Sequence, residues 1–313
     1  MEILKKTSII SAVSPAAGRV PRRAGALAGA LALLLLAASC KPIELGLYKV
    51  LGHGPTVNDR IDDLDDVPGP ANNVLYDGKF SFIVTSDVHF GNKGASYARD
   101  DAAFYAKVLE LKNTMAVPPS FTVCAGDVIE NGDQEDEWED YQTWCRTLEA
   151  LLGNKVYTTT GNHDLYNDGW DYFEDYTYPG TGFFRFTVAG YTFYFLDSGS
   201  ASLGSKQYKK FRDAAEADPN PKIVCTHYPA YGTAQFFQNY YTMQNTEEAD
   251  TLISFCTNNH VKLYLSGHMH EQHENDLGKF TELVIPCYAV YHKFAVVTVD
   301  TAAKTESWTF VSY

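Results

Sequence analysis

The chain has 313 residues, 45% of them hydrophobic and 20% charged, and its formal net charge is −14. This composition is typical of a globular protein and argues against a largely disordered chain or a membrane channel. The charge is uneven, because residues 40–313 hold 20 basic and 38 acidic side chains, a net charge of −18. Nucleic-acid binding is therefore not expected, since it needs a basic surface. A phosphate-bearing ligand would need a local positive centre, such as a metal ion.

The first 39 residues are predicted to be a signal peptide. An apolar run without charges, residues 24–39, follows Arg22 and Arg23. It is shorter than the roughly 20 residues of a spanning helix, and basic residues before a short apolar segment are typical of secreted proteins. The run ends in Leu36-Ala37-Ala38-Ser39-Cys40, which resembles the lipoprotein box of bacteria. The resemblance implies that Cys40 is lipidated and becomes the first mature residue. An ordinary cleaved signal and an uncleaved anchor are the alternatives.

Residues 40–79 are expected to form a tether that joins the lipid anchor to a folded domain. Gly52-His53-Gly54-Pro55, an acidic segment over residues 59–66, and Pro68-Gly69-Pro70 favour a solvated, extended chain over a core. The protein is thus predicted to be an exported bacterial lipoprotein, anchored to a membrane in the periplasm or at the cell surface.

Cysteine usage argues against two kinds of site. Five cysteines are left beyond Cys40, an odd number, and no CxxC motif occurs. Neither a disulfide framework nor a zinc site made of thiolates is therefore expected.

Strand-like and helix-like segments alternate from residue 80 onward, which predicts one α/β domain over residues 80–313. β-branched and aromatic runs predict strands, and apolar residues at helical spacing predict helices. The predicted strands are residues 80–85, 121–125, 156–160, 183–188, 191–196, 223–226 and 261–265, and the predicted helices are residues 97–113, 133–152, 203–217 and 247–259. Residues 282–313 are predicted to form antiparallel strands, with a turn near residues 301–304.

Five of the predicted strands end in side chains that bind metals. Each motif by itself is common at turns and on surfaces, and His227 alone would be an ordinary buried histidine. All five together, each directly after a strand, indicate one site at the edge of a sheet, where open α/β sheets hold their ligands. The motifs are Asp87-Val88-His89, Gly126-Asp127, Gly161-Asn162-His163-Asp164, His227 and Gly267-His268-Met269-His270.

The donor atoms of these motifs suit two divalent metal ions. Carboxylate, imidazole and amide groups are ligands of manganese, iron or zinc. Two such ions, about 3.5–4 Å apart, clamp a phosphate and generate hydroxide between them. Their charge would also provide the positive centre that the acidic chain otherwise lacks.

The ordered set of motifs resembles that of the calcineurin-like metallophosphoesterases, over roughly residues 80–275. The resemblance implies a two-sheet β-sandwich flanked by helices (αββα). It also implies hydrolysis of phosphomonoesters or phosphodiesters by a hydroxide that bridges two metals. Asp87, His89 and His270 would hold the first metal, Asn162, His227 and His268 would hold the second, and Asp127 would bridge the two.

The resemblance further implies a catalytic role for His163, which would face the phosphoryl group and stabilise its charge or protonate the leaving oxygen. Asp164 would hold the imidazole of His163 in position and raise its pKa. His89, at the third position of its motif, argues against the purple acid phosphatase branch, whose iron carries a tyrosinate. The motif looks more like those of the cyclic-nucleotide phosphodiesterase and general phosphoesterase branches.

The substrate is less well defined by the sequence. Asn92, Tyr166 and Tyr228 lie close to motif residues and are expected to reach a small phosphoester substrate. The aromatic residues within 166–178 either form a wall that stacks on a base or sugar, or pack under a loop. Two alternative functions are a nuclease of the same family, disfavoured by the acidic charge, and a non-catalytic surface binding lipoprotein, disfavoured by the complete ligand set.

Overall fold

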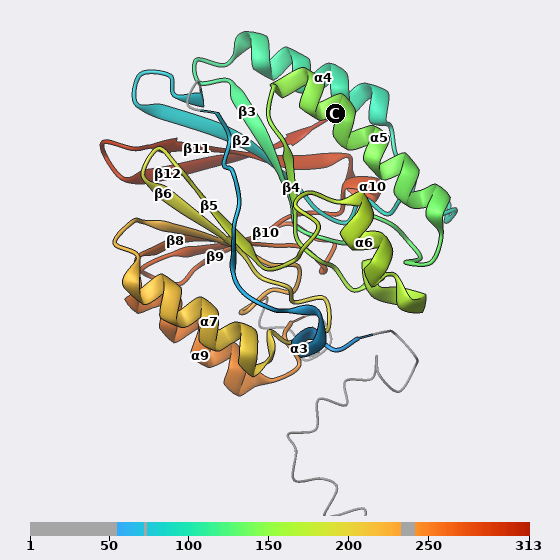
Figure 1. Ribbon diagram of the computed structural model, residues 1–313. Coiled ribbons are helices and arrows are strands. Elements are labelled where there is room, and N and C mark those ends of the chain that lie inside the picture. Colours follow the sequence, from blue (N-terminus) through green and yellow to red (C-terminus); the bar gives the residue numbers. More distant parts are fainter. Residues whose placement is uncertain (1–54, 72–73, 233–241) are drawn as a thin grey trace, which may run out of the picture. The chain divides into compact units, whose positions relative to one another are not determined.

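The structure of the protein, a computed structural model, describes residues 55–71, 74–232 and 242–313. The predicted signal peptide and the predicted lipidation site at Cys40 lie outside these residues. Two β-sheets pack face to face, and helices cover the outer face of each sheet (Figure 1). This arrangement confirms the expected α/β class and the two-sheet sandwich flanked by helices.

The first sheet carries the loops that hold the first three motifs. Its strand order is β12-β11-β2-β3-β4, in which β2, β3 and β4 are parallel and β11 is antiparallel to both of its neighbours. Parallel strands end at the same edge of a sheet, so the loops after β2, β3 and β4 are neighbours. The strands are β2 (Lys79–Thr85), β3 (Pro119–Cys124), β4 (Val156–Thr158), β11 (Lys293–Asp300) and β12 (Thr305–Ser312).

Helices α4 (Asp101–Thr114) and α5 (Glu135–Leu152) cover the outer face of the first sheet (Figure 1). The first turn of α5 is acidic, and the positive end of the helix dipole stabilises these negative side chains. The helix ends at Gly153, whose φ of 86° is the left-handed conformation that closes many helices. Its aromatic side chains hold it on the sheet, and the largest fully buried ones are Trp138, Tyr141 and Trp144.

The second sheet carries the loops of the last two motifs. Its strand order is β1-β5-β6-β7-β8-β10-β9, and β6, β7, β8 and β10 are parallel. Helices α7 (Gly204–Ala217) and α9 (Thr246–Asn258) cover its outer face (Figure 1). The strands are β1 (Asp65–Asp66), β5 (Phe184–Val188), β6 (Tyr191–Phe195), β7 (Lys222–Cys225), β8 (Val261–Ser266), β9 (His273–Asp276) and β10 (Thr281–Val284).

The core between the two sheets is aromatic. Phe82 and Phe121 of the first sheet stack with their ring centroids 5.1 Å apart, and Phe193 of the second sheet meets Phe82 edge-on at 5.2 Å. All three side chains are fully buried. Large rings in offset or edge-on contact stabilise the packing of the two sheets and limit how the sheets can shift against each other. The motif-bearing strand ends of both sheets are thereby held close together.

The segment before β2 belongs to the domain. Helix α3 (Val57–Arg60) lies against α7, and both Val57 and Ile61 are buried in the cluster formed with α7 and α9. Strand β1 extends the second sheet by pairing parallel to β5. The expectation of a solvated tether is therefore corrected for residues 55–71 and 74–79. The reason is that Val57 and Ile61 are buried on one side of the segment, while the acidic side chains at 59–66 stay at the surface.

The prediction that residues 282–313 form only antiparallel strands is wrong in part. Strands β11 and β12 do form an antiparallel pair, joined at the predicted turn. Strand β10, however, pairs parallel to β8 and belongs to the second sheet. Among the helices that the structure describes, none combines the length and the apolar character needed to cross a bilayer.

Candidate metal centre

The seven predicted ligands leave the ends of five strands and meet in one place. In chain order, β2, β3 and β4 of the first sheet lead to the first four ligands, and β7 and β8 of the second sheet lead to the last three. Five of the seven have positive φ angles, between 50° and 64°, which turn the chain sharply as it leaves a strand. Backbone strain of this kind concentrates at functional sites. The five strained ligands are Asp87, His89, Asp127, His268 and His270.

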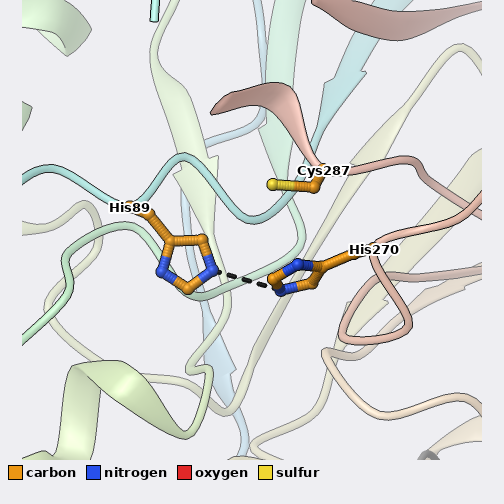
Figure 2. Close-up of side chains that lie close together, drawn as sticks. All are labelled: His89, His270 and Cys287. Carbon is orange, nitrogen blue, oxygen red and sulfur yellow. Dashed lines mark hydrogen bonds between the residues drawn. The ribbon is translucent and has the colours of Figure 1, made fainter. Parts of the chain in front are cut away.

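The first candidate position is formed by Asp87, His89 and His270. The Nε2 atoms of the two histidines are 3.3 Å apart, and His270 Nε2 lies 3.3 Å from Asp87 Oδ1. The dashed line in Figure 2 joins the two rings. Asp87 Oδ1 is buried and has no hydrogen-bond partner among the residues that the structure describes. Ligand atoms that each lie about 2.0–2.2 Å from one metal ion are roughly 3 Å from one another, so these separations fit a shared cation. A divalent cation would also satisfy the orphaned carboxylate oxygen.

The second candidate position is formed by Asn162, His227 and His268. His227 Nε2 lies 3.1 Å from Asn162 Oδ1, 3.1 Å from Asp127 Oδ2 and 3.2 Å from His268 Nδ1. The carboxylate of Asp127 thus joins this position, and its ligand atoms also fall within the group made by Asp87, His89 and His270. Asp127 is therefore shared by the two groups of candidate ligand atoms.

Opposite charges compensate each other at the centre. Burial lowers the pKa of His270, but the Asp87 carboxylate outweighs burial and raises that pKa to about 12. Burial likewise lowers the pKa of His227, and Asp127 raises it to about 9. Burial raises the pKa of the carboxyl groups of Asp87 and Asp127, but their histidine partners together have the larger effect. The pKa of Asp87 is lowered to about 2, and that of Asp127 lies well below its ordinary value. In this state two protons neutralise two buried carboxylates, and metal cations would take the place of those protons.

Partners outside the ligand set orient three of the histidines. His227 Nδ1 donates to the backbone oxygen of Ala125 at 2.8 Å, and His270 Nδ1 lies 3.4 Å from the hydroxyl of Tyr97. His89 Nδ1 lies 3.0 Å from Glu130 Oε2, although the N–H does not point directly at that oxygen. Such contacts leave Nε2 of each ring facing the centre, which is how ligating histidines are usually held.

Three residues that the sequence did not indicate also lie at the centre: Tyr97, Glu130 and Cys287. Glu130 follows Asp127 by three residues in the same loop, and that short distance was the only signal available for it. Cys287 lies beside His89 and His270 (Figure 2), with its Sγ donating to the backbone oxygen of Asp87 at 3.2 Å. Burial raises the pKa of this thiol, so it stays protonated and supports the strained backbone of Asp87.

His163 lies at the edge of the centre. Its side chain is 23% exposed, and its ring centroid is 4.7 Å from that of His89. Its backbone N–H donates to Asp127 Oδ1 at 2.8 Å. Its Nδ1 lies 2.9 Å from the backbone oxygen of Glu130 and 3.7 Å from the Glu130 carboxylate.

Asp164 has a different place from the one expected. Its two oxygens accept from four backbone N–H groups, those of Asp127, Val128, Ile129 and Gly161, at 2.8–3.3 Å. Burial and the nearby charge of Asp127 raise its pKa to about 7. The expectation that Asp164 holds the imidazole of His163 is therefore corrected. The carboxylate ties together the loops after β3 and β4, and the residue next to the imidazole is Glu130.

The three expected substrate residues differ in their availability. Asn92 uses its amide within the protein, donating to Glu130 Oε2 at 2.7 Å and accepting from the N–H of Gly94 at 2.8 Å. Tyr228 is buried, and its ring lies 3.8 Å from that of His268. Tyr166 is half-buried, accepts from Asn162 Nδ2 at 2.9 Å and has its ring 4.5 Å from that of His163. Of the three, Tyr166 alone lies beside His163 with an exposed portion.

The aromatic residues within 166–178 pack mainly in the interior of the domain. Most of this segment lies in the 3-10 helix η3 (His163–Asp168) and in helix α6 (Trp170–Tyr176). Trp170 and Phe173 are buried in the cluster under α5, and Phe173 meets Trp138 edge-on at 6.2 Å. These two rings stabilise the domain and do not form a wall for substrate.

Residues 80–272, more than half of the chain, match the sequence pattern of the family described as calcineurin-like phosphoesterase. The chain belongs to this family. It is therefore a hydrolase that acts on phosphoric ester bonds, and family membership implies divalent metal ions, for which Asp87, His89, Asp127 and His270 are candidate ligands. Among curated proteins, no sequence matches this phosphoesterase.

Solved structures are similar to this phosphoesterase at low sequence identity. Purple acid phosphatase PPD1 from yellow lupin is 12% identical, with a TM-score of 0.50 over 75% of this chain and 54% of that chain. GAP50, the anchor in the inner membrane complex of Plasmodium, is 15% identical, with a TM-score of 0.47 over 75% and 84%. Phosphopantetheinyl hydrolase PptH from Mycobacterium tuberculosis is 14% identical, with a TM-score of 0.44 over 66% and 89%. The likeness to the lupin phosphatase concerns the fold alone.

Proposed function

We propose that the protein is an exported, membrane-tethered phosphoesterase that hydrolyses small phosphomonoesters or phosphodiesters with two divalent cations of manganese, iron or zinc. The observation that carries the two-metal part is the place of Asp127, whose carboxylate belongs to both groups of candidate ligand atoms. A carboxylate shared by two groups keeps two cations close enough to act on a single phosphate.

The chemistry divides between the cations and the chain. When bound, the cations supply a positive field that polarises the phosphoryl oxygens and lowers the pKa of water. The chain orients the reactants: Asp127 accepts from the backbone of His163 and so places this histidine next to the centre. Because Nδ1 of His163 lies against the Glu130 carbonyl, Nε2 is the atom left to meet a phosphoryl oxygen or a leaving group.

The charge of the chain favours a small substrate. Residues 40–313 carry a net charge of −18, which repels a polyanion such as DNA or RNA unless a basic surface offsets it. A small phosphoester needs only the field of the cations. The two alternative functions to be tested against this proposal are a nuclease and a non-catalytic binding lipoprotein.

Export and tethering rest on the first 40 residues alone. The apolar run and the box ending at Cys40 support lipidation, which would place the domain outside the cytoplasm. The test is to express the full chain and a Cys40→Ser variant in a bacterium with a radiolabelled fatty acid. The wild-type chain should carry the label and stay with the membranes. An unlabelled wild-type chain would contradict the lipoprotein assignment.

Hydrolysis is tested with the purified chain, loaded with Mn²⁺, on bis-p-nitrophenyl phosphate, p-nitrophenyl phosphate and single-stranded DNA. Metal-dependent release of nitrophenol from one of the small esters, with no cleavage of DNA, is the expected result. Preference between the two small esters separates a diesterase from a monoesterase. Hydrolysis of DNA alone would favour the nuclease, and no hydrolysis of any of them would favour the binding protein.

A further inference from the structure

A buried ion pair joins α3, in the segment before β2, to a turn that supports the loops of the metal centre. Arg60, on α3, makes a two-pronged contact with Asp197, with Nε 2.8 Å from Oδ2 and Nη2 3.0 Å from Oδ1. The two side chains are 1% and 0% exposed. Nη2 also donates to the hydroxyl of Ser200 at 3.1 Å. Paired charges of this geometry keep a fixed orientation, because each contact constrains the other.

The turn that Arg60 contacts, residues 197–200, is hydrogen-bonded to the loop that carries His227. Next to Asp197, the hydroxyl of Ser198 accepts from the backbone N–H groups of His227 and Tyr228, both at 2.9 Å. Ser198 is fully buried. Asp197 Oδ1 accepts from the N–H of Gly199 at 3.0 Å, so the same carboxylate that binds Arg60 also shapes this turn. A shift of the turn therefore displaces the backbone of a predicted ligand of the second metal.

The same turn also packs on the loop that carries Asn162. A Cβ atom at Gly199 would lie 2.7 Å from the backbone oxygen of Gly161 and 2.8 Å from Leu165 Cδ1, so the two loops are in close contact. On the other side, the guanidinium carbon of Arg60 lies 5.5 Å from the ring centroid of Trp170, directly after the loop of Asn162. Arg60 thus contacts groups that support two of the three loops of the second position, those of Asn162 and His227.

We propose that Arg60 is a positioning residue for the second metal, because it holds the turn at residues 197–200 against the loops of Asn162 and His227. The inference rests on the proposed two-metal function. It means that the segment preceding β2, expected from the sequence to be a tether, sets the affinity of the centre for one of its two cations. Residues that orient ligands from outside the coordination sphere change metal affinity by about 10–100-fold when they are altered.

The chain offers a matched control. Arg185 makes an equally two-pronged contact with Asp66, at 2.6 Å and 3.0 Å, and this pair also ties the N-terminal segment to the second sheet. Its side chains are 28% and 72% exposed, and Arg185 also donates to the hydroxyl of Tyr194 on β6. Replacement of either arginine by lysine keeps the charge and loses the two-pronged geometry.

The experiment is a calorimetric titration of the metal-free full chain with Mn²⁺, for the wild type, Arg60→Lys and Arg185→Lys. The wild type and Arg185→Lys should show two binding events with the same pair of affinities. In Arg60→Lys, the affinity of the position formed by Asp87, His89 and His270 should stay the same. The affinity of the other position should fall by about 10–100-fold. Weakening of one site only is the readout, since a general loss of stability would not change the ratio of the two affinities.

Each further outcome has a defined meaning. If the ratio of the two affinities in Arg60→Lys equals that of the wild type, Arg60 supports the fold alone and the inference is overturned. If the wild type binds no second Mn²⁺, the proposed two-metal function fails together with the inference. Should Arg60→Lys fold poorly, the double variant Arg60→Met/Asp197→Asn removes the charge pair without leaving an unpaired buried charge. The same selective loss supports the inference there, and an unchanged ratio overturns it.

Discussion

The carboxylate of Glu130 lies 3.0 Å from His89 Nδ1 and 3.7 Å from His163 Nδ1, so one side chain faces both a predicted metal ligand and the predicted catalytic histidine. Its backbone oxygen also lies 2.9 Å from His163 Nδ1. The carboxylate is fixed in turn by Asn92, which donates to it at 2.7 Å. Asn92 therefore acts on the centre through Glu130.

The position of Glu130 predicts a loss of turnover when its charge is removed. Glu130→Gln should lower kcat by about 10–100-fold, because an amide of the same size lacks the negative charge that faces both imidazoles and orients them less firmly. The measurement is kcat at saturating Mn²⁺, with Glu135→Gln at the exposed start of α5 as the control. An unchanged kcat in Glu130→Gln would show that the carboxylate has no part in orienting the two histidines.

His163→Ala should separate catalysis from metal binding. Removal of the imidazole should lower kcat by about 10²–10⁴-fold, the usual contribution of a general acid or base. Metal content should stay close to that of the wild type, since His163 Nδ1 faces Glu130 and the two candidate positions keep their ligands. Elemental analysis of the purified variant checks this. Loss of metal from His163→Ala would make His163 a ligand and remove it from the catalytic role.

Asp127→Asn should weaken both metals at once. The Asp127 carboxylate belongs to both groups of ligand atoms, and it is the charge partner of His227. Its neutralisation should lower both affinities for Mn²⁺ by at least about 10-fold. Titration calorimetry measures the two affinities, and Asp133→Asn, an exposed residue of the same loop, serves as the control. If one affinity alone falls, Asp127 is not the bridging ligand.

Glu282 predicts a pH dependence of stability. Its carboxyl group is fully buried and accepts from the backbone N–H groups of Ala230, Tyr231 and Gly232 and from Asn275 Nδ2. Burial raises the pKa of Glu282 above its ordinary value of 4.5 in spite of these contacts. The folded state therefore binds this proton more tightly than the unfolded state does. The stabilisation from this group is present below pH 4.5 and is lost as the pH rises toward the raised pKa.

The prediction for Glu282 is a difference in slope. Between pH 4.5 and the raised pKa, the unfolding free energy of the wild type should fall relative to that of Glu282→Gln. One group can contribute at most about 1.4 kcal/mol per pH unit. Urea unfolding of the metal-free wild type and variant at several pH values measures this difference. A wild-type advantage that grows with pH would mean that the folded protein lowers the pKa of Glu282.

Several elements of the fold follow from local pattern. The strands β2, β3, β7 and β8 and the helices α5, α7 and α9 were predicted within a few residues of their observed bounds, because each has its own apolar periodicity. The position of β10 was predicted only in part, since a four-residue run does not indicate the sheet in which it pairs. The segment of α3 and β1 was predicted as tether, because its few apolar residues are outnumbered by acidic ones.

The sequence by itself determined which polar side chains follow the strands, and therefore which residues are candidate ligands. It did so because each motif is adjacent in the chain to the strand that presents it. Only the tertiary structure decided which residues orient those ligands. Arg60 and Asp197 are 137 residues apart, and His89 and His270 are 181 apart. Contacts over such separations depend on how two sheets and their connecting loops pack, and no local pattern in the sequence records them.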